Sequence, residues 1–124
     1  MDPEKRHDAC AFLHQHWRNG TRCDALPPDL HPADRAQAYQ VQSCIEDYST
    51  QPLMGWKIAA TSTAGQAHIG VDGPMAGRLL AERAILDGAS FVMGNTLMKV
   101  AEMEFAFRMA EDGVVTVSER RSTR

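Results

Sequence analysis

Residues 98–109 place apolar side chains at nearly every second position, and this pattern constrains the fold more than any other stretch. One side of an extended chain would carry residues that are all apolar except the first, namely Lys99, Ala101, Met103, Phe105, Phe107 and Met109. A period of two residues is typical of a strand with one buried face. We therefore predict a strand over residues 98–109 whose apolar face packs on a core.

The other side of this predicted strand carries two acidic residues, Glu102 and Glu104. Residues i and i+2 of a strand lie about 6–7 Å apart on the same face. Two carboxylates at that separation can converge on one hard cation such as Mg²⁺ or Mn²⁺. A Glu-x-Glu pair is also common on solvated strand faces, so the pair by itself leaves both interpretations open.

The first half of the chain carries clear helix signals. Asp2 and Pro3 suit the N-cap and first position of a helix, which the apolar spacing continues to Asn19 before Gly20 ends it. A second helix is predicted from Pro32 or Ala33 to about Gln51, where Pro52 stops it.

Strands are predicted after the Pro52 break. The segment 53–60 alternates as a strand, and hydroxyl residues at 61–63 can cap a short helix over 64–68 that Gly70 closes. Segments 75–80, 85–93 and 114–117 are further strand candidates. We therefore predict an α+β fold in which N-terminal helices are followed by mixed β strands.

Composition excludes several classes of function. The 124-residue chain has a net charge of −3, so no basic excess favours nucleic acid or a membrane surface. The polar start shows no signal peptide and no apolar run is as long as a membrane span, so we expect a cytoplasmic protein. Three cysteines without a CxxC pair predict reduced thiols.

Three motifs in a fixed order carry a resemblance to a known family. They are Gly-Trp-Lys-Ile-Ala-Ala-Thr-Ser at 55–62, Gly-Val-Asp-Gly-Pro-Met-Ala-Gly-Arg-Leu-Leu at 70–80 and Ala-Glu-Met-Glu-Phe-Ala-Phe at 101–107. The sequence resembles the 2-keto-4-pentenoate hydratase and 4-oxalocrotonate decarboxylase group of the fumarylacetoacetate hydrolase superfamily. Ala-Tyr-Gln-Val-Gln at 38–42 also matches the family's second helix.

The resemblance implies a metal-dependent lyase acting on a small 2-oxo acid in aromatic catabolism. In the family, Mg²⁺ or Mn²⁺ sits on three carboxylates, two of which map onto Glu102 and Glu104. The metal chelates the 2-oxo acid and stabilises the enolate as a Lewis acid. Lys57 maps onto an active-site lysine that moves protons or balances charge. Thr61, Ser62 and Asp72 are implied substrate contacts.

The resemblance ends near Met109, and family members are considerably longer. We expect residues 1–109 to be the N-terminal part of a hydratase- or decarboxylase-like domain with an incomplete fumarylacetoacetate-hydrolase-like fold. Residues 110–124 are expected to be a divergent, frayed tail without the third metal carboxylate. The chain would then be a truncated hydratase. Alternatively, it is an inactive fragment, or a subunit that pairs with a full-length relative or with copies of itself.

Overall fold

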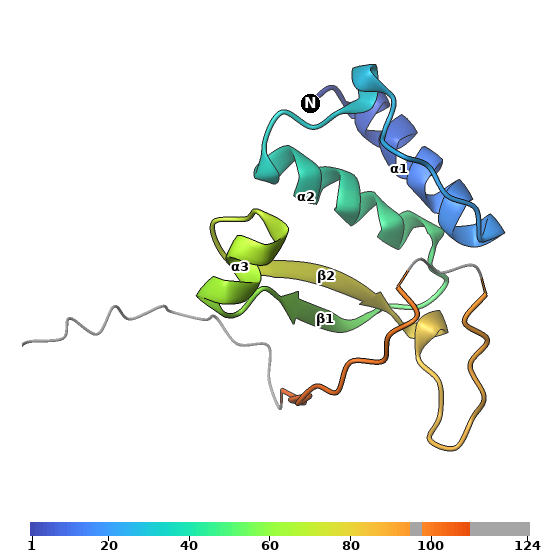
Figure 1. The fold of residues 1–124 in the computed structure, drawn as a ribbon. Coiled ribbons are helices and arrows are strands. Elements are labelled where there is room, and N and C mark those ends of the chain that lie inside the picture. The colour runs from blue at the N-terminus through green and yellow to red at the C-terminus, as the bar shows by residue number, and fades with distance from the viewer. Residues whose placement is uncertain (95–97, 110–124) are drawn as a thin grey trace, which may run out of the picture.

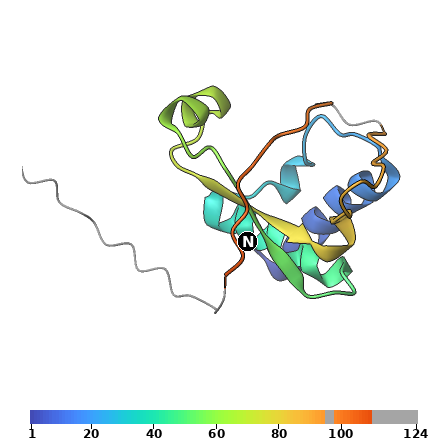
Figure 2. The ribbon, with the colours of Figure 1, turned by 90° about the horizontal axis from the view of Figure 1, so that it is seen from below.

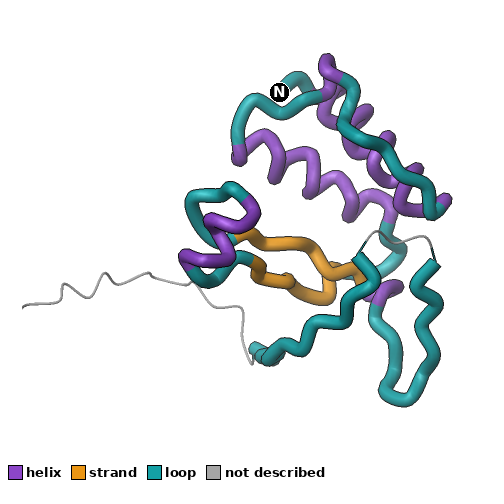
Figure 3. Tube along the Cα trace, in the orientation of Figure 1, coloured by secondary structure: helices purple, strands orange, loops and turns teal. Residues whose placement is uncertain are grey.

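The computed structural model describes residues 1–94 and 98–109, which form three α-helices and one two-stranded sheet (Figure 1). The helices are α1 (Pro3–Asn19), α2 (Arg35–Ser43) and α3 (Thr63–Ile69), and the strands are β1 (Leu53–Ala59) and β2 (Met75–Leu80). Short 3₁₀ turns occupy Pro28–Leu30, Cys44–Tyr48 and Ala81–Arg83. Figure 3 shows that the described chain after β2 is mostly loop. The α+β class is as predicted.

The predicted helix ends of α1 and α3 are confirmed. The Asp2 carboxylate accepts hydrogen bonds from the backbone N–H groups of Glu4 and Lys5, and Gly20 ends α1 with a φ of 63°. The Ser62 side chain caps α3, and Gly70 closes it with a φ of 71°. In both helices, a side-chain oxygen satisfies an unpaired N–H at the start and a left-handed glycine ends the ladder.

The second helix is shorter than predicted. It begins at Arg35, because Asp34 is its N-cap, and it is α-helical only to Ser43. A 3₁₀ turn then continues to Tyr48. The helix that was predicted to run to about Gln51 therefore ends in a 3₁₀ turn, whose tighter geometry the proline boundary at Pro52 does not distinguish from an α-helix.

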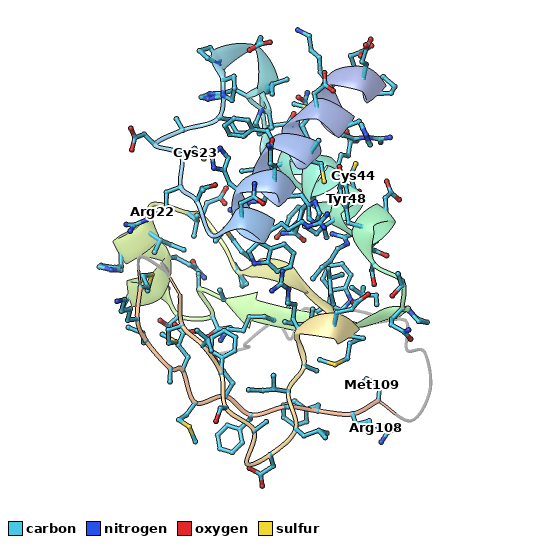
Figure 4. All side chains as sticks on the ribbon, turned by 90° about the vertical axis from the view of Figure 1, so that its right-hand side faces the viewer. Arg22, Cys23, Cys44, Tyr48, Arg108 and Met109 are labelled. Carbon is cyan, nitrogen blue, oxygen red and sulfur yellow. The ribbon has the colours of Figure 1, made fainter. Side chains whose placement is uncertain are left out.

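The core lies between α1 and α2. Ala9, Cys10, Val41 and Cys44 are buried together, and Figure 4 shows Cys44 and Tyr48 beside α1. The Tyr48 ring stacks on His14 with centroids 3.8 Å apart. Burial, together with the nearby Cys44, raises the pKa of Cys10 to about 11. All three cysteines are free, as predicted, and Cys10 is a core residue.

The sheet pairs β1 with β2 in antiparallel register, with Lys57 opposite Gly77 and Trp56 opposite Arg78. Helices α1 and α2 lie together on one side of it (Figures 1 and 2). Arg78 joins the two layers, because it donates to the Gln42 side chain at 3.0 Å and forms an ion pair with Glu46. Its guanidinium also lies 4.5 Å from the centroid of the Trp56 ring.

A second set of polar contacts holds the end of β2 against the loop that precedes β1. Glu82 accepts hydrogen bonds from the Ser49 hydroxyl at 2.8 Å and from the backbone N–H of Thr50 at 2.8 Å. Together with its own backbone N–H, these donors lower the pKa of Glu82 to about 2. The ionised carboxylate thus fixes this junction.

Two predicted strands are wrong. The segment 85–93 is a loop, and residues 98–109 are extended without belonging to a strand. Among the described residues, neither segment is paired with a neighbouring strand, and a β-strand requires backbone hydrogen bonds to such a neighbour. The apolar side of 98–109 is not buried: Met103, Phe105 and Phe107 are 97%, 96% and 88% exposed. The predicted strand at 114–117 and the predicted tail at 110–124 lie outside the described residues.

Candidate functional site

Lys57 lies in the middle of β1, and its position follows from the alternation of that strand. Leu53, Gly55, Lys57 and Ala59 are half-buried, whereas Met54, Trp56 and Ile58 are exposed. Backbone pairing with Gly77 fixes Lys57 in the sheet. The Lys57 side chain is 33% exposed, so its ammonium group reaches the surface from a partly covered stem.

The two glutamates converge on this ammonium group. The Nζ atom of Lys57 lies 3.2 Å from Oε2 of Glu102 and also forms an ion pair with Glu104. The extended segment 98–109 carries them across the molecule on the side of the sheet away from α1 and α2 (Figures 1 and 2). Arg108 and Met109 mark the far end of this segment in Figure 4. The structure therefore brings together three of the six predicted site residues.

A cavity of about 280 Å³ lies beside Lys57, between α2 and the sheet. Its polar lining comes from Arg35, Tyr39, Gln42 and Lys57, and the rest is mostly small residues. The Tyr39 hydroxyl accepts a hydrogen bond from the backbone N–H of Ala76 at 3.0 Å, which leaves its own proton available to a ligand. A cavity of this size suits a small organic acid.

Asp72 is held by a residue that the sequence patterns did not single out. Arg35, at the start of α2, forms an ion pair with Asp72, and the Asp72 side chain is 91% exposed. Arg35 lines the cavity as well, so it connects Asp72 with the space beside Lys57. No local pattern marks Arg35, because its ion pair with Asp72 joins residues 37 positions apart in the sequence.

Thr61 and Ser62 lie between β1 and α3. The Ser62 hydroxyl accepts the backbone N–H of Gly65 at 3.1 Å as the cap of α3, and Thr61 is exposed. Neither lines the cavity beside Lys57. Their predicted role in binding substrate stays a prediction. The Ser62 hydroxyl oxygen already has a structural role, because it accepts the hydrogen bond that caps α3.

Charge at the site favours a cation. Lys57, Glu102 and Glu104 together carry one net negative charge, and the oxygens of both carboxylates already point at one positive group. Within residues 1–94 and 98–109, no cluster of three or more His, Cys, Asp or Glu side chains could hold a metal ion. Asp72 is thus not a third ligand beside the glutamates.

In this same part of the chain, no helix is long and apolar enough to cross a membrane.

Three curated proteins are similar to this chain over most of its length. It is 34% identical to 2-keto-4-pentenoate hydratase 2 of Dechloromonas aromatica over 115 residues, which cover 90% of this chain and 43% of that protein. It is 34% identical to 2-keto-4-pentenoate hydratase 1 of the same organism over 107 residues, covering 84% of this chain and 41% of that protein. The TodF product hydratase of Pseudomonas putida is 29% identical over 107 residues, 84% of this chain and 40% of that protein.

These matches confirm the resemblance to 2-keto-4-pentenoate hydratases, and the chain spans about two fifths of the length of these curated relatives. No family model matches the sequence. No solved structure matches it either.

Proposed function

We propose that this chain supplies the lysine and two of the carboxylates of a divalent-metal-dependent hydratase acting on 2-keto-4-pentenoate-type 2-oxo acids. The observation that carries the proposal is the convergence of Glu102 and Glu104 on the Lys57 ammonium beside a cavity of about 280 Å³. The similarity to named hydratases supports it. An incomplete fumarylacetoacetate-hydrolase-like fold is part of the same proposal.

The residues present fit a hard cation. Glu102 and Glu104 offer oxygen ligands, which Mg²⁺ and Mn²⁺ prefer, and the Lys57 ammonium marks a position where both carboxylates already hold a positive charge. Two carboxylates alone make a weak site, so a further ligand from the substrate, water or another chain would complete the coordination. When bound, the ion would supply Lewis-acid stabilisation of the enolate of a 2-oxo acid.

The residues of the cavity have definite tasks in this proposal. Arg35 presents a guanidinium that can pair with the carboxylate of the acid. The Tyr39 hydroxyl can donate its free proton to an oxygen of the ligand. Lys57 lines the same space and would carry a proton on Nζ while water adds to the double bond.

A second candidate function is that of a subunit that acts only in association with copies of itself or with a longer relative. The near-complete exposure of Met103, Phe105 and Phe107 favours it, because such apolar side chains are typical of surfaces that another chain covers.

One experiment tests the proposal and separates these candidates. The chain is assayed for Mg²⁺-dependent loss of the absorbance of 2-hydroxypenta-2,4-dienoate, alone and mixed with a full-length relative whose own Glu-x-Glu pair has been inactivated. Glu102→Gln is expected to abolish turnover in whichever arm shows it, and Glu4→Gln, on the exposed first turn of α1, should leave the rate unchanged. Full turnover by Glu102→Gln refutes the metal role. Activity in the mixture alone favours the subunit.

A further inference from the structure

We propose that Lys57 is an internal counter-ion that competes with the divalent cation for Glu102 and Glu104, so that metal loading turns the ammonium group out of the carboxylate pair. This inference rests on the proposed function, since it requires the two glutamates to be metal ligands. It adds a step to it: binding of the cation releases the Lys57 ammonium group from the two glutamates.

The geometry makes the two positive groups mutually exclusive. The Lys57 Nζ atom lies 3.2 Å from Glu102 and pairs with Glu104. A bound Mg²⁺ or Mn²⁺ would require carboxylate oxygens at about 2.0–2.2 Å, on the sides now turned to the ammonium group. A divalent ion and an ammonium group cannot both occupy the space between two carboxylates, because they need the same oxygens and repel each other at so short a distance.

The displaced ammonium group can move into solvent, because the Lys57 side chain is 33% exposed. A lysine stem has four rotatable bonds, so the ammonium group can leave the two glutamates while the backbone stays paired with Gly77. Displacement therefore needs no change in the sheet.

The ion pairs of Lys57 with Glu102 and Glu104 also allow the opposite effect on metal affinity. Among the described residues, the ion pairs with Lys57 are the side-chain polar contacts that connect the segment 98–109 to the sheet. If their main effect were to hold this segment in place, removing Lys57 would weaken metal binding. The direction of the change in affinity thus decides between competition and mere positioning.

The test is a titration of the full chain with Mn²⁺, followed by the paramagnetic relaxation of water protons, without substrate or turnover. Lys57→Met removes the ammonium group and keeps an unbranched stem. Two exposed ion pairs hold the ammonium group, so Lys57→Met is expected to bind Mn²⁺ about 2-fold to 30-fold more tightly than the wild type. Lys99→Met removes the same charge from the segment, outside any described ion pair, and should change the affinity by less than about 2-fold.

Several outcomes overturn the proposal. Affinity that is unchanged or weaker in Lys57→Met, or no binding by either protein in the millimolar range, contradicts competition. Circular dichroism and a second variant, Lys57→Gln, guard against misfolding, because both substitutions should tighten binding equally. Loss of binding in Glu102→Gln with no gain in Lys57→Met would sink this inference alone. Unchanged binding in Glu102→Gln would sink the proposed metal site as well.

Discussion

Replacing Arg78 by methionine should destabilise the protein more than the same replacement of Arg35, which also forms an ion pair with a carboxylate. The Arg78 side chain is 15% exposed and connects β2 to the helical layer through Glu46 and Gln42, while it also lies over Trp56. Methionine keeps the apolar stem and removes the guanidinium. The three contacts on one side chain belong to different elements, so their loss would loosen the joint between the layers.

The magnitude follows from those contacts. A hydrogen bond to a charged group contributes about 1.5–3 kcal/mol and a cation–π contact about 0.5–1 kcal/mol. Glu46 is 42% exposed and water can replace part of its pairing, so the contributions do not simply add. We expect a loss of about 2–3 kcal/mol in the free energy of unfolding. For a domain of this size, that lowers the Tm by about 10–20 °C.

The assay is urea denaturation followed by circular dichroism and by tryptophan fluorescence, with two matched variants. Arg35→Met removes a guanidinium whose partner, Asp72, is 91% exposed, and should cost less than about 1 kcal/mol. Arg78→Lys keeps the charge but loses the planar fork, and should fall between Arg78→Met and the wild type. A cost below about 0.5 kcal/mol for Arg78→Met, or one equal to that of Arg35→Met, would refute the reasoning.

Two further predictions concern ionisation. The pKa of Glu82 is lowered from 4.5 to about 2 by its hydrogen bonds, including those from Ser49 and Thr50, so its stabilisation is fully present above pH 4.5 and is lost as the pH falls towards 2. Glu82→Gln should flatten the acid limb of the unfolding curve measured by circular dichroism, and an unaltered limb would contradict this. Cys23 is exposed, whereas burial raises the pKa of Cys10 to about 11. A disulfide reagent at pH 8 should therefore modify Cys23 many times faster than Cys10, and equal rates in single-cysteine variants would argue against it.

The elements that could be predicted from the sequence are those whose signals are local. Asp2 and Ser62 mark helix starts because a short polar side chain bonds to N–H groups two or three residues away, and Gly20 and Gly70 mark ends because they adopt a positive φ. The strand at 53–59 also has its partner, β2, close by in the chain, across α3. These parts depend on residues that are near neighbours in the sequence.

The elements that could not be predicted depend on distant partners. Segments 85–93 and 98–109 have the composition of strands, but alternation says only which side chains share a side. Whether a strand forms depends on a neighbouring chain that offers its N–H and C=O groups. For the same reason Arg35 was missed, because its connection to Asp72 joins residues 37 positions apart.

Residues 98–109 of the candidate site combine one feature that the sequence predicts with one that it does not. Alternation put Glu102 and Glu104 on one side of the chain, and both form ion pairs with Lys57, yet the side that was predicted to be buried is the one that faces outward. Two ion pairs turn the glutamates to the sheet, and Phe105 and Phe107 are left exposed on the opposite side. The carboxylates are therefore placed by the cation that they hold, which is why exchanging that cation for a metal ion is the decisive test of what this site does.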